Sequence, residues 1–175
     1  MAARVTVVAY DRDWPQRFDR ERALLEEVLA PWLDGGVHHV GSTAIPGIAA
    51  KPIVDMIAGV RDFEEARAAY APLARHGYDH TPHRPGIAHH FSKPSPNPLE
   101  AEFSLHLTER GSDLWNERLA FRDTLRADPA LAAEYEALKL RLAGEHPDDV
   151  GAYTTAKREF VARVLALSGL EPGRR

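Results

Sequence analysis

A short loop of small polar residues lies between two apolar segments in the first third of the chain. Gly41, Ser42 and Thr43 follow a β-branched run that ends at Val40, and Asp55 lies in the next apolar segment. A Gly-Ser loop that leaves a strand exposes backbone N–H groups and a hydroxyl, and both can hold phosphate oxygens. A carboxylate on the adjacent strand can hold Mg²⁺ against the same phosphates. The twelve residues between Ser42 and Asp55 fit the spacing of a nucleotidyltransferase site.

The acidic half of this pattern is incomplete. A second acid is expected two residues after Asp55, on the same face of the strand, and that position is Ile57. Phosphoryl transfer with two metal ions needs several carboxylates that converge on one point. The alternative interpretation is a tight turn that needs glycine, followed by one solvated aspartate. The loop is not a P-loop, because Lys51 is followed by Pro52 and the Gly-Lys dipeptide is absent.

Glu102 and His106 are the candidates to complete the site. Residues 102–107 alternate between polar and apolar, so Glu102, Ser104 and His106 share one face of a predicted strand. Glu102 could join Asp55 as a metal ligand, and His106 could bind metal or act as a general base. The alternative is a solvated strand face on which both side chains are merely exposed.

The remaining histidines include two adjacent pairs. His38-His39 and His89-His90 each place their side chains on opposite faces of a strand, so neither pair can serve one metal ion. His39 lies two residues before Gly41 of the Gly-Ser loop, where it could contact a phosphate.

Two helical segments carry cations beside apolar side chains. Lys157 falls between Tyr153 and Phe160 on an apolar stripe, and Arg122 follows Phe121. Arg122 belongs to a row with one-turn spacing: Arg118, Arg122 and Arg126. A half-buried cation needs an anionic partner, which is either an internal carboxylate or a phosphate-bearing ligand.

The elements that position these residues can be read from the hydrophobic periodicity. Helical spacing predicts a helix over 14–33 that ends at Gly35-Gly36, and another over about 62–75. Apolar runs predict strands over 37–40, 52–60 and 102–107, the second of them central, with a strand or extended arm over 4–9. Ser112, Asp128-Pro129 and Asp148/Asp149 each begin a helix, the last reaching about Leu167. The sequence therefore predicts an α+β fold with a helical C-terminal third.

Composition narrows the class of protein. A length of 175 residues predicts a single domain over 1–175 with a real hydrophobic core. The formal net charge of −4 argues against a general nucleic-acid coat protein, which is usually basic. The absence of cysteine excludes disulfides, thiolate metal ligands and a cysteine nucleophile. Because the sequence has no long apolar signal core and no run of transmembrane length, we expect a cytoplasmic protein.

Several blocks of the sequence, in order over residues 5–168, resemble the GrpB family. The N-terminal blocks are Tyr10-Asp11, Trp14-Pro15, His39-Val40-Gly41-Ser42-Thr43, Pro46-Gly47, Lys51-Pro52-Ile53 and Asp55. The later blocks are Leu105-His106-Leu107, Gly111-Ser112, Phe121-Arg122-Asp123, Leu125-Arg126, Tyr135, Leu138-Lys139, Leu142-Ala143, Tyr153 and Lys157. The resemblance implies a nucleotidyltransferase-like fold, a mixed β-sheet flanked by helices. Family members occur alone or fused to dephospho-coenzyme A kinase, and this chain, which lacks a kinase P-loop, looks like the free-standing form.

We therefore predict a nucleotidyltransferase-like enzyme that acts on a small metabolite, with Mg²⁺ (or Mn²⁺) and a nucleoside triphosphate as co-substrate. Asp55 and His106 are the predicted catalytic residues, and Asp55 and Glu102 the predicted metal ligands. The residues expected to contact the ligand are His39, Gly41, Ser42, Thr43, Lys51, Arg122 and Lys157.

Two alternatives remain at this point. Ile57 favours a non-catalytic module that binds a nucleotide or a coenzyme A-like ligand, since one carboxylate supports binding more easily than two-metal catalysis. An accessory factor for another protein would instead need a large exposed apolar patch, and the predicted helices show none, so this alternative ranks last. The expected partner is a small molecule or nucleotide, with no membrane and no nucleic acid, and the oligomeric state stays open.

Overall fold

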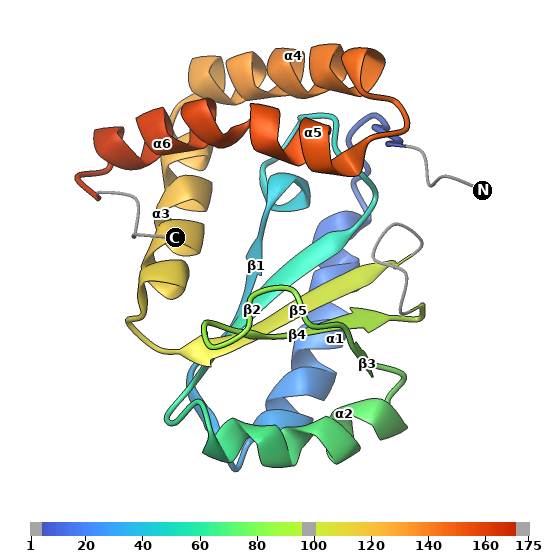
Figure 1. Ribbon diagram of the computed structural model, residues 1–175, viewed down its shortest axis with the longest axis vertical. Helices are drawn as coiled ribbons and strands as arrows, with labels where there is room; N and C mark the ends of the chain where they lie inside the picture. The colour runs from blue at the N-terminus through green and yellow to red at the C-terminus, as the bar shows by residue number, and fades with distance from the viewer. Residues whose placement is uncertain (1–4, 96–100, 171–175) are drawn as a thin grey trace.

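The computed structural model describes residues 5–95 and 101–170. Its five strands form one mixed sheet in the order β1-β2-β5-β4-β3 (Figure 1). The strands are β1 (Leu33–Val40), β2 (Val54–Val60), β3 (Asp79–His80), β4 (His89–Lys93) and β5 (Phe103–Glu109). β2 and β5 are parallel and every other pair is antiparallel, which confirms the predicted α+β fold with a mixed sheet.

Helices cover both faces of this sheet. α1 (Trp14–Leu29) and α2 (Tyr70–Arg75) pack on one face, where the main hydrophobic core contains side chains of β2 and β5. The other helices gather at the opposite side and at one end of the sheet (Figure 1). They are α3 (Asp113–Ala127), α4 (Pro129–Glu145), α5 (Val150–Ala156) and α6 (Arg158–Leu167). The C-terminal third is thus helical, as predicted.

Side-chain caps explain where three of these helices begin. The Ser112 hydroxyl accepts a hydrogen bond from the Trp115 amide at the start of α3. The Asp128 and Asp149 carboxylates accept from backbone amides at the starts of α4 and α5. All three starts lie where the sequence predicted them, because a short polar side chain satisfies amides that have no partner inside the helix.

The first helix is shorter than predicted. α1 ends at Leu29, and Gly35 and Gly36 lie inside β1 rather than at the end of the helix. Pro31 cannot continue a helix, since it lacks an amide hydrogen. Both glycines have positive φ, at a place where the register between β1 and β2 shifts. They therefore serve a β-bulge, which the sequence does not distinguish from a helix stop.

The last predicted helix is divided at Lys157. α5 ends at Ala156 and α6 begins at Arg158, so the continuous helix predicted from Asp148/Asp149 to Leu167 is wrong. Tyr153 packs into a small core with Leu142, whereas Phe160 packs into a separate one formed by α3 and α4. The interruption at Lys157 thus lies between two aromatic side chains that enter different cores.

Other segments differ less from the prediction. The helix expected over 62–75 is a 3₁₀ turn, Glu65–Ala69, followed by α2. Residues near the N-terminus form an extended arm with a single bridge between Val8 and Ala50. β2 is central as predicted, with β1 and β5 as its neighbours. No helix within residues 5–95 and 101–170 is long and apolar enough to cross a membrane.

Candidate functional site

Gly41 and Asp55 lie in direct contact. Val40 and Asp55 are paired across β1 and β2, so the chain leaves β1 beside the carboxylate. Gly41 has φ 71° and ψ −172°, and a β-carbon placed there would lie 2.5 Å from Asp55 Oδ2. Only glycine accommodates both this backbone conformation and this contact. The structure thus brings together the two halves of the motif that the sequence singled out.

The loop after β1 is held by Thr43 and His39 on the side of the sheet that α1 covers. The Thr43 hydroxyl donates to the Ile53 carbonyl at 3.0 Å, so it accepts from His39 Nε2 at 2.9 Å. The His39 ring stacks on Phe18 of α1, with 4.9 Å between ring centroids. Burial and the charges of Arg126 and Arg122 lower the pKa of His39 to about 4, so the ring is neutral at pH 7. His39 therefore supports the loop from the α1 side of the sheet.

The same loop is also held by side chains of α4. The Ser42 hydroxyl donates to the Tyr135 hydroxyl at 3.5 Å. The Ala49 amide donates to Glu136, and Lys139 Nζ donates to the Ala49 carbonyl. Lys139 is 1% exposed, and its ammonium lies 4.8 Å from the centre of the Tyr135 ring. The loop is thus fixed on both sides, which keeps Ser42 at the edge of the adjacent pocket.

A pocket of about 590 Å³ lies between the sheet face that carries Asp55 and the helices α3, α5 and α6. Its lining contains Gly41, Ser42, Thr43 and two carboxylates, Asp55 and Glu117. Five cationic side chains also line it: Lys51, Arg84, Arg118, Lys157 and Arg158. We call it the basic pocket. Its excess of positive charge suits an anionic ligand.

Lys51 and Lys157 approach the same aromatic ring in the basic pocket. Their ammonium groups lie 6.0 Å and 4.3 Å from the centre of the Tyr153 ring, which is 1% exposed. Burial, together with the charges of Lys51 and Lys139 and against the opposing effect of Asp55, lowers the pKa of Lys157 to about 7. An anion bound between the two lysines would relieve this repulsion.

Arg118 is a pocket residue that the sequence interpretation passed over in favour of Arg122. Arg118 lines the basic pocket, and its charge lowers the pKa of Lys157 in the pocket and of His90 and His106 in the adjacent sheet. Arg122 instead donates from Nη1 to the His39 carbonyl at 3.1 Å and from Nε to Asp123 at 2.7 Å. Both lie in one row of arginines, and the sequence does not fix which faces the sheet.

The structure does not bring Glu102 together with Asp55. Glu102 lies outside β5, and its Oε2 is 2.9 Å from Nη2 of Arg17 on α1. Its side chain is 60% exposed. Within the described residues, no cluster of three or more His, Asp or Glu side chains could hold a metal ion. Asp55 therefore lacks the carboxylate partner that the sequence suggested.

His106 does share the Asp55 face, as the alternation predicted. It is paired with Ile57 across β2 and with His90 across β4, and the two imidazole centroids are 4.5 Å apart. Burial, and then the charge of Arg118, hold the pKa of His106 well below its usual value. The ring is consequently neutral, and it is buried and does not line the basic pocket.

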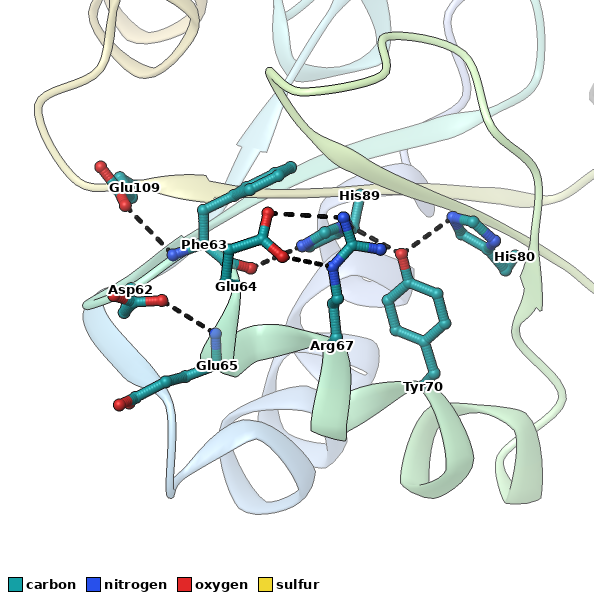
Figure 2. A network of polar contacts seen from close by, with 9 residues as sticks. All are labelled: Asp62, Phe63, Glu64, Glu65, Arg67, Tyr70, His80, His89 and Glu109. Carbon is teal, nitrogen blue, oxygen red and sulfur yellow. Dashed lines mark hydrogen bonds and ion pairs between the residues drawn. The ribbon is translucent and has the colours of Figure 1, made fainter.

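His89 and His90 point to opposite faces, as their adjacency predicted. Figure 2 shows His89 in a network on the α2 side, where Nδ1 lies 2.8 Å from the Tyr70 hydroxyl and Nε2 lies 2.7 Å from the Phe63 carbonyl. The carbonyl can only accept, so Nε2 donates and Nδ1 accepts from Tyr70. An ion pair between Glu64 and Arg67 lies in the same network. His89 thus joins β4 to α2 and is separate from the basic pocket.

The carboxylates in the basic pocket suit one Mg²⁺ ion that is shared with phosphate oxygens better than they suit a two-metal site. Mg²⁺ is often held by one or two carboxylates together with phosphate oxygens and water. Asp55, next to the loop and facing the cations, fits that arrangement. A two-metal site needs more carboxylates, and Ile57 is fully buried against α3 where the second would stand.

Comparisons with known proteins identify the family of this chain. The family profile described as "GrpB protein" matches residues 4–167. The chain is 37% identical over 161 residues to the UPF0157 protein YqkA of Bacillus subtilis, covering 90% of this chain but 45% of that protein. It is 35% identical over 170 residues to the glutamate-rich protein GrpB of Alkalihalophilus pseudofirmus, covering 92% and 94%. A dephospho-CoA kinase of Mycolicibacterium paratuberculosis is 28% identical over 189 residues, covering 90% of this chain and 44% of the kinase.

Solved structures show the same fold. GrpB from Enterococcus faecalis superposes with a TM-score of 0.83 at 28% identity, covering 93% of this chain and 96% of that one. The nucleotidyltransferase Cid1, solved with its short product ApU, gives a TM-score of 0.50 at 14% identity, covering 76% and 42%. The second likeness concerns the fold alone. The chain, matched by the family profile over nearly its whole length, belongs to the GrpB family.

Proposed function

We propose that this protein binds a nucleotide in the basic pocket, with the phosphates between Asp55 and the surrounding cations. The observation that carries this proposal is the set of five cationic side chains around the Gly41–Asp55 contact. A polyphosphate would supply the negative charge that balances the ammonium groups of Lys51 and Lys157 beside Tyr153. The Ser42 hydroxyl and the loop amides would contact the same phosphates.

Mg²⁺, or Mn²⁺, would be held by Asp55 and by the phosphates themselves. The ion would offset the repulsion between the Asp55 carboxylate and an approaching phosphate. Its chemistry, when bound, is to stabilise the charge of the phosphates during transfer. The role of this chain is to place the phosphates, through Lys51 and Lys157, beside Asp55 at the N-terminal end of β2.

Two functions follow from such binding, and a specific observation favours each. Transfer of a nucleotidyl group to a small metabolite is favoured by Asp55, which faces the cations from a nucleotidyltransferase-like sheet. A non-catalytic nucleotide- or coenzyme A-binding module is favoured by Ile57 and by the ion pair that holds Glu102 on Arg17. Dependence on the metal separates them, because only transfer requires it.

A thermal-shift series with nucleoside triphosphates, with and without Mg²⁺, tests the proposal. A ligand at a hundredfold excess over its Kd stabilises the folded state by about 2.7 kcal/mol, which raises Tm by a few degrees. We expect this rise with Mg²⁺ present, and we expect Asp55→Asn to lose the effect of the metal. The matched control is Asp34→Asn, because Asp34 is a half-exposed carboxylate paired with Arg110.

The outcomes are distinct. A rise that is the same with and without Mg²⁺, and in Asp55→Asn, would favour the binding module. No rise with any nucleotide or with coenzyme A would contradict nucleotide binding altogether.

A further inference from the structure

A hydroxyl, an imidazole and a backbone carbonyl form a chain of hydrogen bonds that starts in the basic pocket. Ser104 lines the pocket and is paired with Asp55 across the parallel strands β2 and β5, so both side chains point to the same face. Ser104 Oγ lies 3.0 Å from His90 Nε2 on the adjacent strand β4. His90 Nδ1 lies 2.9 Å from the carbonyl oxygen of Thr81 and 2.8 Å from the Thr81 hydroxyl.

Both oxygens of Thr81 bear on the direction of these hydrogen bonds. A carbonyl oxygen only accepts and a hydroxyl oxygen can accept as well, so a proton on His90 Nδ1 satisfies both contacts. The Nε2 atom of the neutral ring then has a free lone pair, and the Ser104 hydroxyl donates to it. Burial lowers the pKa of His90, and this effect outweighs the opposing ones of the Thr81 carbonyl and Asp55, so the ring is neutral near pH 7.

This arrangement is that of an activated nucleophile. A serine hydroxyl becomes reactive when a neutral imidazole accepts its proton and a third group fixes the orientation of the ring. Here the third group is the Thr81 carbonyl. Ser104 also lines the same pocket as Arg118 and Lys157, which would neutralise charge on a phosphate.

We propose that Ser104 is a nucleophile that accepts a nucleotidyl group from a nucleoside triphosphate, with His90 as its general base. Ser104 Oγ forms a bond to the α-phosphorus while the bond from that phosphorus to the α–β bridging oxygen breaks. Pyrophosphate leaves with the electron pair of that bond, and the hydroxyl proton passes to His90 Nε2. The product is a nucleotidyl ester on Ser104, from which the group can pass to a second acceptor.

This inference rests on the proposed binding of a nucleotide in the basic pocket. It adds a covalent acceptor on the enzyme, on the strand next to Asp55, where a further acid was expected from the sequence. Ser104 and His90 would supply the nucleophile and the base from side chains that are neutral at pH 7.

The test is transfer of radioactive label to the purified chain of 175 residues. The protein is incubated with Mg²⁺ and each of four nucleoside triphosphates, labelled in one arm at the α-phosphate and in the other at the γ-phosphate. We expect label from the α-phosphate alone to remain on the denatured protein, up to one group per chain. Mass spectrometry of peptides should place it on Ser104.

Three variants make the result specific. Ser104→Ala and His90→Gln should each lower α-label on the protein by at least a hundredfold. Ser92→Ala should retain it, because Ser92 is a buried hydroxyl on the same sheet face that contacts Thr81 Oγ1 and does not line the pocket. Circular dichroism and Tm of each variant establish that it is folded, and Ser104→Thr, which keeps a hydroxyl, should retain part of the label if Ser104→Ala fails to fold.

Several results would overturn the inference. These are label from the γ-phosphate, α-label that is unchanged in folded Ser104→Ala, and no label at all. If triphosphates raise Tm but no label is retained, the inference is wrong and nucleotide binding stands. If they neither raise Tm nor label the chain, both proposals fail.

Discussion

Replacing Gly41 with alanine is expected to lower the free energy of unfolding by about 3 kcal/mol, since backbone strain and a steric clash add at this residue. The backbone at Gly41 has φ 71° and ψ −172°, a conformation essentially confined to glycine. The new methyl group would also lie 2.5 Å from Asp55 Oδ2. Urea unfolding followed by circular dichroism measures the loss.

Gly47 provides the matched control for strain without a clash. It lies in the same loop with φ 84°, and a β-carbon there would meet no atom within 4 Å. Gly47→Ala should therefore cost only about 1 kcal/mol, the usual penalty for an alanine in the left-handed region. Asp55→Ala should recover part of the loss in Gly41→Ala but none of the loss in Gly47→Ala. Equal losses in the two glycine variants, with no recovery, would contradict the Gly41–Asp55 contact.

Triphosphate affinity is expected to fall by about tenfold per pH unit above neutral pH, because binding would add one proton to Lys157. In the free protein the pKa of Lys157 is lowered from 10.5 to about 7. A bound phosphate raises it again, so above pH 7 the ligand binds together with a proton. Isothermal titration calorimetry between pH 7.5 and 9.5, in buffers of different ionisation enthalpy, measures both the affinity and the proton uptake.

The stability of the free protein should change in the opposite direction. Between pH 7 and 10.5 the unfolded chain keeps a proton on Lys157 that the folded chain does not, so this residue makes stability rise with pH. Lys157→Met should weaken triphosphate binding at pH 7.5, remove the proton uptake and flatten this part of the stability profile. An affinity that is independent of pH in the wild type would show that no phosphate lies beside Lys157.

The sequence predicted the fold because its signals were local. Ser112, Asp128 and Asp149 cap helices with their own side chains, and residues 102–107 alternate strictly in polarity. The prediction that Gly35-Gly36 ends the first helix was wrong, because glycines with positive φ occur in a β-bulge as well as at the end of a helix. The break at Lys157 was missed because it depends on two separate cores that receive Tyr153 and Phe160, which no local pattern records.

The site was predicted in part for the same reason. Gly41, Ser42 and Asp55 could be joined because they lie at the ends of two adjacent strands that pair directly. Arg118 and Arg122 are equivalent in the sequence, and only the packing of α3 decides that Arg118 lines the pocket while Arg122 binds the His39 carbonyl. Ser104 and His90 lie on different strands, so their contact becomes visible only in the order of the sheet.

The most direct test of nucleotide binding in the basic pocket is a crystal structure of the chain with Mg²⁺ and a triphosphate analogue that cannot be cleaved between the α- and β-phosphates. We predict phosphate oxygens within ion-pair distance of Lys51, Lys157 and Arg118, on the side of the pocket that faces Asp55. Phosphates bound elsewhere on the molecule, or turned to solvent with the base in the pocket, would contradict it.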